Sequence, residues 1–347
     1  MATWHVIILI LGIAAFFRDL AVLPALFGYV RGARVRDIEK EATPRMRLLV
    51  QAAGGQPGLE ENVIAALRQN YPPFQARFLH DDGDSAAANA IRAAQEAVTD
   101  LAGDVGAPPR RLAAVSGGVR PDPLFLRDIA HSLAEAEWVG LPTVLIGAKG
   151  RGAQLLALTV NVDLLAMVVM GDGRWLPTGA LGTRAGNVED EESLAEHLDD
   201  GLIEGPGEIG RRPVVAPAPT LATLTESRDE IAARMRPLKA LAPVLFHLWG
   251  VHSMAPALLL LATPSGGGWA TIILFGLLLL TRLISTVLVD ARLCRDLSTI
   301  RALAQLPFLW FVEPAAYWVA WRSKSEEQEG EGEESEAEGE ADVRAPA

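Results

Sequence analysis

Three long apolar runs lie near the two ends of the chain and limit the architectures open to it. They are Trp4–Val30, Leu241–Ala262 and Trp269–Val289. A helix of about 20 apolar residues crosses the ~30 Å hydrocarbon core of a bilayer, so each run is long enough to span. A fourth run, Leu303–Trp321, carries two prolines and a glutamate and fits an interfacial segment or a third span. The sequence therefore predicts an N-terminal transmembrane helix over 1–30 and a C-terminal membrane region over 241–322.

The charges around these runs predict how the chain is oriented. Arg18 and Asp19 interrupt the first run, and charges at this depth rarely face lipid. We therefore expect them to pair with each other or with other helices. Basic residues follow the first run, at Arg31, Arg34, Arg36, Lys40, Arg45 and Arg47. By the positive-inside rule, the chain is predicted to be an integral membrane protein whose soluble domain faces the cytoplasm, with the lipid bilayer as a partner.

Composition excludes several other classes of protein. The formal net charge is −12, but the Glu-rich tail over 323–347 holds ten acidic and two basic residues and contributes −8 of it. Because this tail has little apolar surface, we expect it to be disordered. The single cysteine, Cys294, excludes an internal disulfide framework and any multi-cysteine metal site. Basic and aromatic residues form no common stripe, so no nucleic-acid partner is expected.

Between the membrane regions, residues 31–240 alternate between strand and helix patterns, which is typical of an α/β layered domain. The expected strands are Arg47–Ala53, Phe74–Leu79, one that starts at Leu112, and Pro142–Ile146. The expected helices are Leu59–Asn70, Ala86–Leu101, Asp122–Trp138 and Gly152–Met170. The last is apolar enough to resemble a membrane span, but Asn161 and Asp163 lie in its middle and favour a helix buried in the domain.

The stretch Leu112–Pro123, LAAVSGGVRPDP, predicts an apolar strand that ends in a glycine turn. An acidic cluster at such a strand end would hold a divalent metal against a diphosphate, because these cations take oxygen ligands from carboxylates. The turn instead holds Ser116, Gly117 and Gly118, with no carboxylate before Asp122. Whether the protein is an enzyme depends largely on this difference.

Several motifs follow one another through the middle of the chain. They are AAGGQPGLEEN at 52–62, QNYP at 69–72, FLHDD at 78–82, VRPDP at 119–123, GALGTR at 179–184, LDD at 198–200 and VVAP at 214–217. Their order and spacing resemble those of family 2 glycosyltransferases, in particular the ceramide glucosyltransferase-like membrane branch, over roughly residues 45–240. The resemblance implies a GT-A-like (nucleotide-diphospho-sugar transferase) α/β domain with flanking transmembrane helices.

The resemblance also implies roles for individual residues. In the family, one carboxylate orients the nucleotide, a DxD motif holds Mg²⁺ or Mn²⁺, and another carboxylate deprotonates the acceptor hydroxyl. By position, the first role falls on Asp81 or Asp82, and the base is Asp200. Each also has a plainer interpretation, since Asp81 and Asp82 fit an ordinary turn and Asp200 follows a solvated acidic run.

This chain departs from the family's pattern at two motifs, the DxD metal motif and a QxxRW segment. The metal positions fall on Ser116, Gly117 and Gly118, which supply no carboxylate, so no metal cofactor is expected. A QxxRW segment that closes over the donor falls near Arg234–Leu238, where Met235, Pro237 and Leu238 replace its Gln, Arg and Trp. If the register shifts by one residue, Arg236 supplies the arginine. Loss of both parts favours a catalytically disabled domain.

Two hypotheses follow from these departures. The first is a glycosyltransferase-like pseudoenzyme that serves as a structural or accessory subunit of a complex in a bacterial inner membrane, with other membrane proteins as partners. The alternative is an active inverting glycosyltransferase that moves a sugar from a nucleotide-sugar to a lipid acceptor at the cytoplasmic face. Mg²⁺ or Mn²⁺, the nucleotide-sugar and the lipid acceptor are expected ligands only in this second case.

Overall fold

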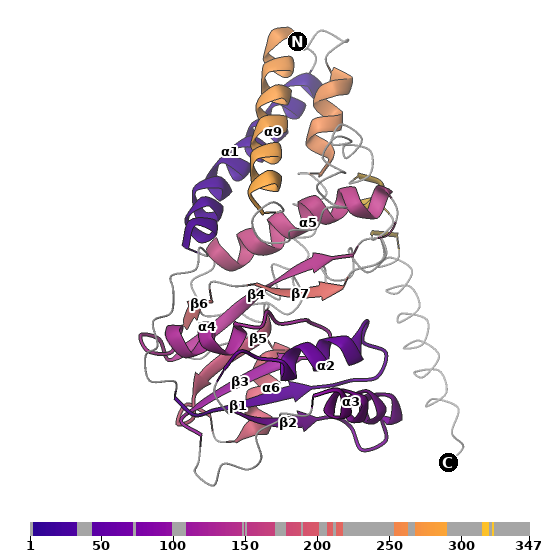
Figure 1. Ribbon diagram of the computed structural model, residues 1–347. Helices are drawn as coiled ribbons and strands as arrows, with labels where there is room; N and C mark the ends of the chain where they lie inside the picture. The colour runs from indigo at the N-terminus through magenta and orange to yellow at the C-terminus, as the bar shows by residue number, and fades with distance from the viewer. Residues whose placement is uncertain are drawn as a thin grey trace, which may run out of the picture.

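Seven strands form one mixed sheet in the middle of the chain (Figure 1). The computed structural model describes residues 3–32, 44–71, 74–98, 109–147, 149, 151–170, 178–188, 190–200, 207–210, 213–217, 253–262, 268–289, 314–318 and 321–322. The strands are β1 (Met46–Gln51), β2 (Gln75–Leu79), β3 (Arg111–Ser116), β4 (Trp138–Ile146), β5 (Thr178–Arg184), β6 (Gly207–Ile209) and β7 (Val214–Pro217). Their order across the sheet is β2-β1-β3-β5-β4-β6, and β7 also pairs with β4.

The direction of the strands divides this sheet into two parts. β1 lies between β2 and β3 and is parallel to both, so the carboxyl ends of these three strands meet at one edge. β5 is antiparallel to β3 and to β4, and separates them. β6 pairs in parallel with the first half of β4 and β7 with its second half. The three-stranded parallel part is therefore where a site at strand ends is expected.

Helices cover both faces of the sheet, and the alternation of side chains along β1 shows which face each one covers. Leu48 and Val50 pack in one core with α2 (Leu59–Leu67), α3 (Ser85–Ala97) and α4 (Phe125–Ser132). Leu49 points the other way, into a second core with α6 (Glu191–Asp200). This arrangement, together with apolar helices on both sides of the domain in sequence, confirms the predicted α/β class with flanking apolar helices.

Two of the described helices are long and apolar enough to cross a membrane, α1 (Thr3–Gly32) and α9 (Gly268–Val289). They pack against each other in parallel: a side chain at Gly12 would touch Leu274, while Leu26 and Val289 share one apolar cluster further along. The shorter helix Ser253–Ala262 packs beside them through Leu259. Most of the expected run Leu303–Trp321, part of Leu241–Ala262 and all of the tail over 323–347 lie outside the described residues.

Helix α5 (Arg151–Met170) lies between the sheet and the pair formed by α1 and α9 (Figure 1). Its residue Asn161 is fully buried and forms two hydrogen bonds with the backbone of Leu145 in β4. Its residue Asp163 faces α1 instead and accepts a hydrogen bond from Arg18. The segment is therefore a helix that packs on the sheet through Asn161 and on α1 through Asp163, and both of these side chains are buried, as expected for a helix within the domain.

Several predicted elements differ in extent, and the largest difference lies between α4 and β4. The helix expected over Leu59–Asn70 ends at Leu67, and the strand expected over Pro142–Ile146 begins at Trp138. The helix expected over Asp122–Trp138 covers only Phe125–Ser132, and Trp138 is already the first residue of β4. The helix starts late because a residue that precedes proline avoids the helical region, and Asp122 precedes Pro123. It ends early because the following residues pair with β5, as Trp138 does with Thr183.

Candidate functional site

The candidate site lies at the carboxyl edge of the three parallel strands. There β1 leads into the loop over 52–58, β2 into the turn over 80–84, and β3 into the turn Ser116–Gly118. Because β1 is the central strand of the three, its loop lies between the two turns. The structure thus brings Asp81 and Asp82 to one side of the β1 loop and Ser116–Gly118 to the other.

Asp84 joins the turn after β2 to the loop after β1. Its carboxylate accepts hydrogen bonds from the backbone N–H of Gly54 and, at 3.0 Å, from that of Ala87 in the first turn of α3. These backbone donors stabilise the charged form and lower the pKa of Asp84 below its usual value. Asp84 is therefore the N-cap of α3 and a clamp on the β1 loop.

On the other side of the β1 loop, Gln56 closes the turn after β3. Its side-chain oxygen accepts from the backbone N–H of Ala53 at 3.1 Å, and its side-chain nitrogen donates to Ser116 Oγ at 3.3 Å. Ser116 Oγ also accepts from the backbone N–H of Gly118 at 3.2 Å. A hydroxyl oxygen has two acceptor lone pairs, and both are used by these N–H donors.

Asn62, a buried residue of α2, hydrogen-bonds with the same turn after β3. Its side-chain nitrogen donates to the carbonyl of Gly117 at 2.9 Å and to that of Pro57 at 3.2 Å. Its side-chain oxygen accepts from Arg120 Nε at 3.3 Å. Asn62, the last residue of the motif at 52–62, therefore connects the turn after β3 (the β3 turn, Ser116–Gly118) with the loop after β1 (the β1 loop, 52–58) through both polar atoms of its side chain.

Gly117 lies close against two side chains of neighbouring elements. A Cβ at this position would come within 2.5 Å of Leu59 Cδ1 and 2.6 Å of Gln56 Oε1. Its backbone N–H donates to the carbonyl of Gln51 at 2.7 Å, which fixes the turn against the end of β1. A larger residue here would therefore displace the side chains of Leu59 and Gln56.

These residues do not fit a divalent cation at the β3 turn. Mg²⁺ and Mn²⁺ favour carboxylate, carbonyl and water oxygens, and here the Ser116 hydroxyl and the Gly117 carbonyl both accept from amide N–H groups of the chain. Asp81 and Asp82 are exposed in the turn after β2. Within the described part of the chain, no three histidine, cysteine, aspartate or glutamate residues form a group that could hold a metal ion.

The remaining predicted site residues are less completely placed. Asp200 is the last residue of α6, which packs on the sheet face opposite to α2 and α3, and its side chain lies outside the described part. The segment Arg234–Leu238, expected near the donor, also lies outside it. The structure therefore does not bring Asp200 together with Asp81 and Asp82 in any described contact.

Three residues that organise the site were missed in the sequence. Asp84 precedes a helical run and so carries the usual signal of an N-cap, which identifies it without a structure. Gln56 and Asn62 lie within the motif at 52–62, but no local signal shows that their amides reach Ser116 and Gly117, 60 and 55 residues away.

Comparison with known proteins gives distant similarities only. No protein-family model matches the chain, and no curated protein matches it significantly. Among solved structures, the chain is similar to the mannosyltransferase PcManGT from Pyrobaculum calidifontis, in complex with GDP-Man and Mn²⁺. That similarity has 13% identity and a TM-score of 0.39, and covers 90% of this chain and 99% of that one.

The chain is also similar to TarS residues 1–349 from S. aureus, with 11% identity and a TM-score of 0.33. This second similarity covers 81% of this chain and 91% of that one. At these levels of identity and structural agreement, neither protein assigns an activity to the chain.

Proposed function

We propose that the chain is a membrane-anchored, glycosyltransferase-like protein that is catalytically disabled and serves as a structural or accessory subunit of a membrane complex. The observation that carries the proposal is the state of the β3 turn. Both acceptor positions of Ser116 Oγ are filled, by Gln56 and by Gly118, and the turn has no carboxylate. The polar groups of the turn hydrogen-bond with the chain's own backbone and loops.

Sugar transfer from a nucleotide-sugar leaves a diphosphate on which negative charge develops. A metal ion or a set of preorganised donors must offset this charge, and removing such stabilisation lowers the rate strongly. At the β3 turn, the described groups supply neither carboxylates for a metal nor free N–H donors aimed outward. The turn is instead part of the packing between β1, β3 and α2.

The parts of the family pattern that persist have structural roles in this chain. Arg120 pairs its backbone with Val215 and its side chain with Asn62. Asp122 accepts from the backbone N–H of Leu124 at 2.9 Å and so shapes the entry to α4. Both residues thus serve the fold of this chain, whereas the β3 turn has no carboxylate that would hold a metal.

Anchoring in a membrane is supported by α1 and α9, which are long and apolar enough to span it. The basic residues that follow the first run favour a domain on the cytoplasmic side, as in a bacterial inner membrane. Other membrane proteins are the proposed partners of the complex.

The second candidate function is an active inverting transferase that moves a sugar to a lipid acceptor. The observation in its favour is the exposure of Asp81 and Asp82 at the carboxyl end of β2, where a nucleotide can reach them. Asp200 would then act as the base, and any Mg²⁺ or Mn²⁺ would be held outside the β3 turn.

Calorimetric titration distinguishes the two functions. The full chain, purified in nanodiscs, is titrated with GDP- and UDP-sugars with and without Mn²⁺, beside an Asp81→Asn/Asp82→Asn variant. We expect no binding of any donor. Binding that Mn²⁺ strengthens, or metal-independent binding that the double variant abolishes, would overturn the disabled-domain proposal and favour the enzyme.

A further inference from the structure

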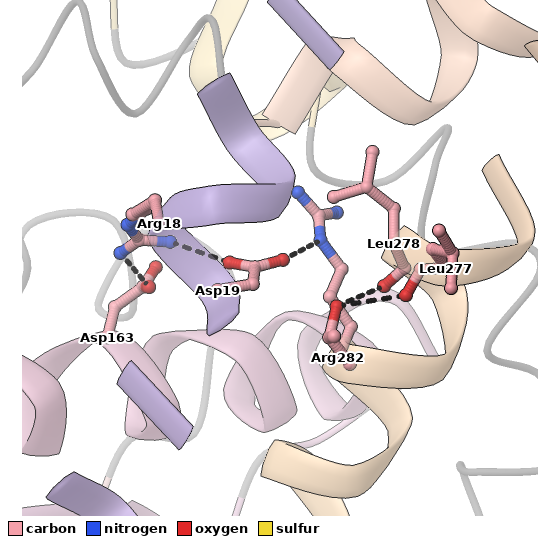
Figure 2. Close-up of polar contacts among 7 residues, drawn as sticks. Arg18, Asp19, Asp163, Leu277, Leu278 and Arg282 are labelled. Atoms are coloured by element: carbon pink, nitrogen blue, oxygen red, sulfur yellow. Dashed lines mark hydrogen bonds and ion pairs between the residues drawn. The ribbon is translucent and has the colours of Figure 1, made fainter. Parts of the chain in front are cut away.

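A row of four charged side chains joins three helices at the junction between the α/β domain and the apolar helices (Figure 2). Asp163 of α5 accepts a 2.5 Å hydrogen bond from Arg18 of α1. Arg18 also lies 3.5 Å from Asp19, and the second oxygen of Asp19 lies 3.5 Å from Arg282 Nε of α9. We call this set, Asp163–Arg18–Asp19–Arg282, the charge row.

The charge row is neutral, and three of its four side chains are buried. The side chains of Asp19, Asp163 and Arg282 are 7%, 4% and 5% exposed, and Arg18 is 38% exposed. Two acids balance two bases, so the row does not attract a ligand of either charge. The cavity beside it is large enough for about one water molecule. The charge row therefore joins the three helices through ion pairs.

Exposed apolar side chains continue along both helices past the level of the charge row. On α1, Leu20 and Phe27 are 44% and 57% exposed; on α9, Ile284 and Val287 are 42% and 41% exposed. Phe27 is nine residues beyond Arg18, which is about 14 Å along a helix. The exposed apolar surface thus extends from Trp4 to Phe27 and then ends before Arg31.

From these observations we infer that the charge row lies within the hydrocarbon layer and that α5 seats the α/β domain in the inner leaflet. The inference rests on the membrane anchoring proposed above. If the charge row lay at the membrane surface, the four large apolar side chains of Leu20, Phe27, Ile284 and Val287 would face water. The surface around the row is continuous with that of the spanning helices, so the occupant we assign to it is lipid.

Helix α5 has the two faces that this position requires. Asn161 and Asp163 are two residues apart, which places them about 200° apart around the helix. Asn161 binds the sheet through Leu145, and Asp163 binds α1 through Arg18. Tyr29 adds a second attachment, because its hydroxyl donates to the carbonyl of Gly210 at 2.9 Å. The domain is therefore fixed to the membrane helices at two levels.

Spin labelling measures the depth directly. Cys294 is replaced by Ser, single cysteines are introduced at Leu20, Phe27 and Ile284 of the full chain, and labelled proteins are placed in phosphatidylcholine/phosphatidylglycerol nanodiscs. Collisions with oxygen report lipid, and collisions with a water-soluble nickel chelate report water. Ile10, above the charge row on α1, serves as the lipid reference, and exposed Glu60 of α2 as the water reference.

The expected result is that all three labels match Ile10, with high oxygen and low nickel accessibility. Nickel accessibility like that of Glu60 would overturn the inference and place the charge row at the surface. Protection from both reagents would overturn it in favour of a protein partner on this face. If Ile10 itself were accessible to nickel, the membrane anchoring would fail, and with it the inference.

Discussion

At the scale of single residues, the negative charge of Asp84 stabilises the folded state. The backbone donors of Ala87 and Gly54 lower its pKa in the folded state. A carboxyl group whose pKa is lowered by folding stabilises the protein above its unfolded pKa of about 4, and this contribution is lost as the pH falls through the folded value. Asp84→Ala should therefore lower the Tm at pH 7, with a difference from wild type that shrinks below about pH 4.

The matched control for Asp84 is Asp82→Ala, since Asp82 is exposed in the same turn. We expect it to leave the Tm and its dependence on pH close to those of wild type. Thermal unfolding in detergent, followed by circular dichroism between pH 7 and pH 3, measures both variants. Equal Tm values for wild type and Asp84→Ala at pH 7 would show that the clamp on the β1 loop does not stabilise the fold.

Gly117 and Gly118 are adjacent but should respond differently to one added methyl group. At Gly117 the new Cβ would meet Leu59 and Gln56 within 2.6 Å, whereas at Gly118 the nearest atom, Ser116 Oγ, is 3.5 Å away. Overpacking of this kind typically costs about 1–3 kcal/mol. Gly117→Ala should lower the free energy of unfolding by that amount, and Gly118→Ala should change it little, as measured by denaturant unfolding; equal effects would be inconsistent with the closed turn.

At the scale of elements, Asn161 of α5 serves as a partner for the backbone of β4. The second half of β4 pairs with β7, and within it the N–H and C=O of Leu145 both hydrogen-bond with the Asn161 side-chain amide. Asn161→Leu keeps the branching and the number of side-chain heavy atoms but leaves the buried N–H and C=O of Leu145 without these partners. Each unsatisfied group typically costs about 1–3 kcal/mol.

Hydrogen exchange tests this arrangement locally. The amide of Leu145 should exchange faster in Asn161→Leu, with a loss of global stability measured by denaturant unfolding. Gln154→Leu, a polar-to-apolar change on the same helix, is the control and should leave exchange in β4 unchanged. Unaltered exchange at Leu145 in Asn161→Leu would contradict the role given to Asn161.

The boundary between α4 and β4 shows where local patterns stop being informative. The spacing of apolar residues predicted one helix over Asp122–Trp138. This spacing carries no information about which strand the end of the segment pairs with. In the structure, backbone bonds from Ala134 to His131 and from Glu135 to Ser132 tighten the chain and end the helix. Trp138 then pairs with β5, which follows it by 40 residues and was not predicted as its neighbour.

At the scale of the whole molecule, the order of strands and helices and the two long apolar helices were predictable, since each is encoded by a nearby pattern. What was not predictable depends on contacts between distant residues. The insertion of β5 between β3 and β4 is one such feature, and the bond between Arg18 and Asp163, 145 residues apart, is another. For the candidate site, the sequence correctly placed Asp81, Asp82 and Ser116–Gly118 at strand ends, but gave no indication that Gln56 and Asn62 fill the β3 turn.

The parallel pairing of α1 with α9 has a consequence for synthesis. α1 emerges from the ribosome first, whereas its neighbour in the finished protein is made more than 230 residues later. During that interval Asp19 has Arg18 as its adjacent counter-charge. Under the membrane anchoring proposed above, α1 would enter the bilayer as a locally neutral unit, and Arg282 would reach Asp19 only after α9 is made. The pairing of α1 with α9 is therefore completed after the α/β domain between them has been synthesised.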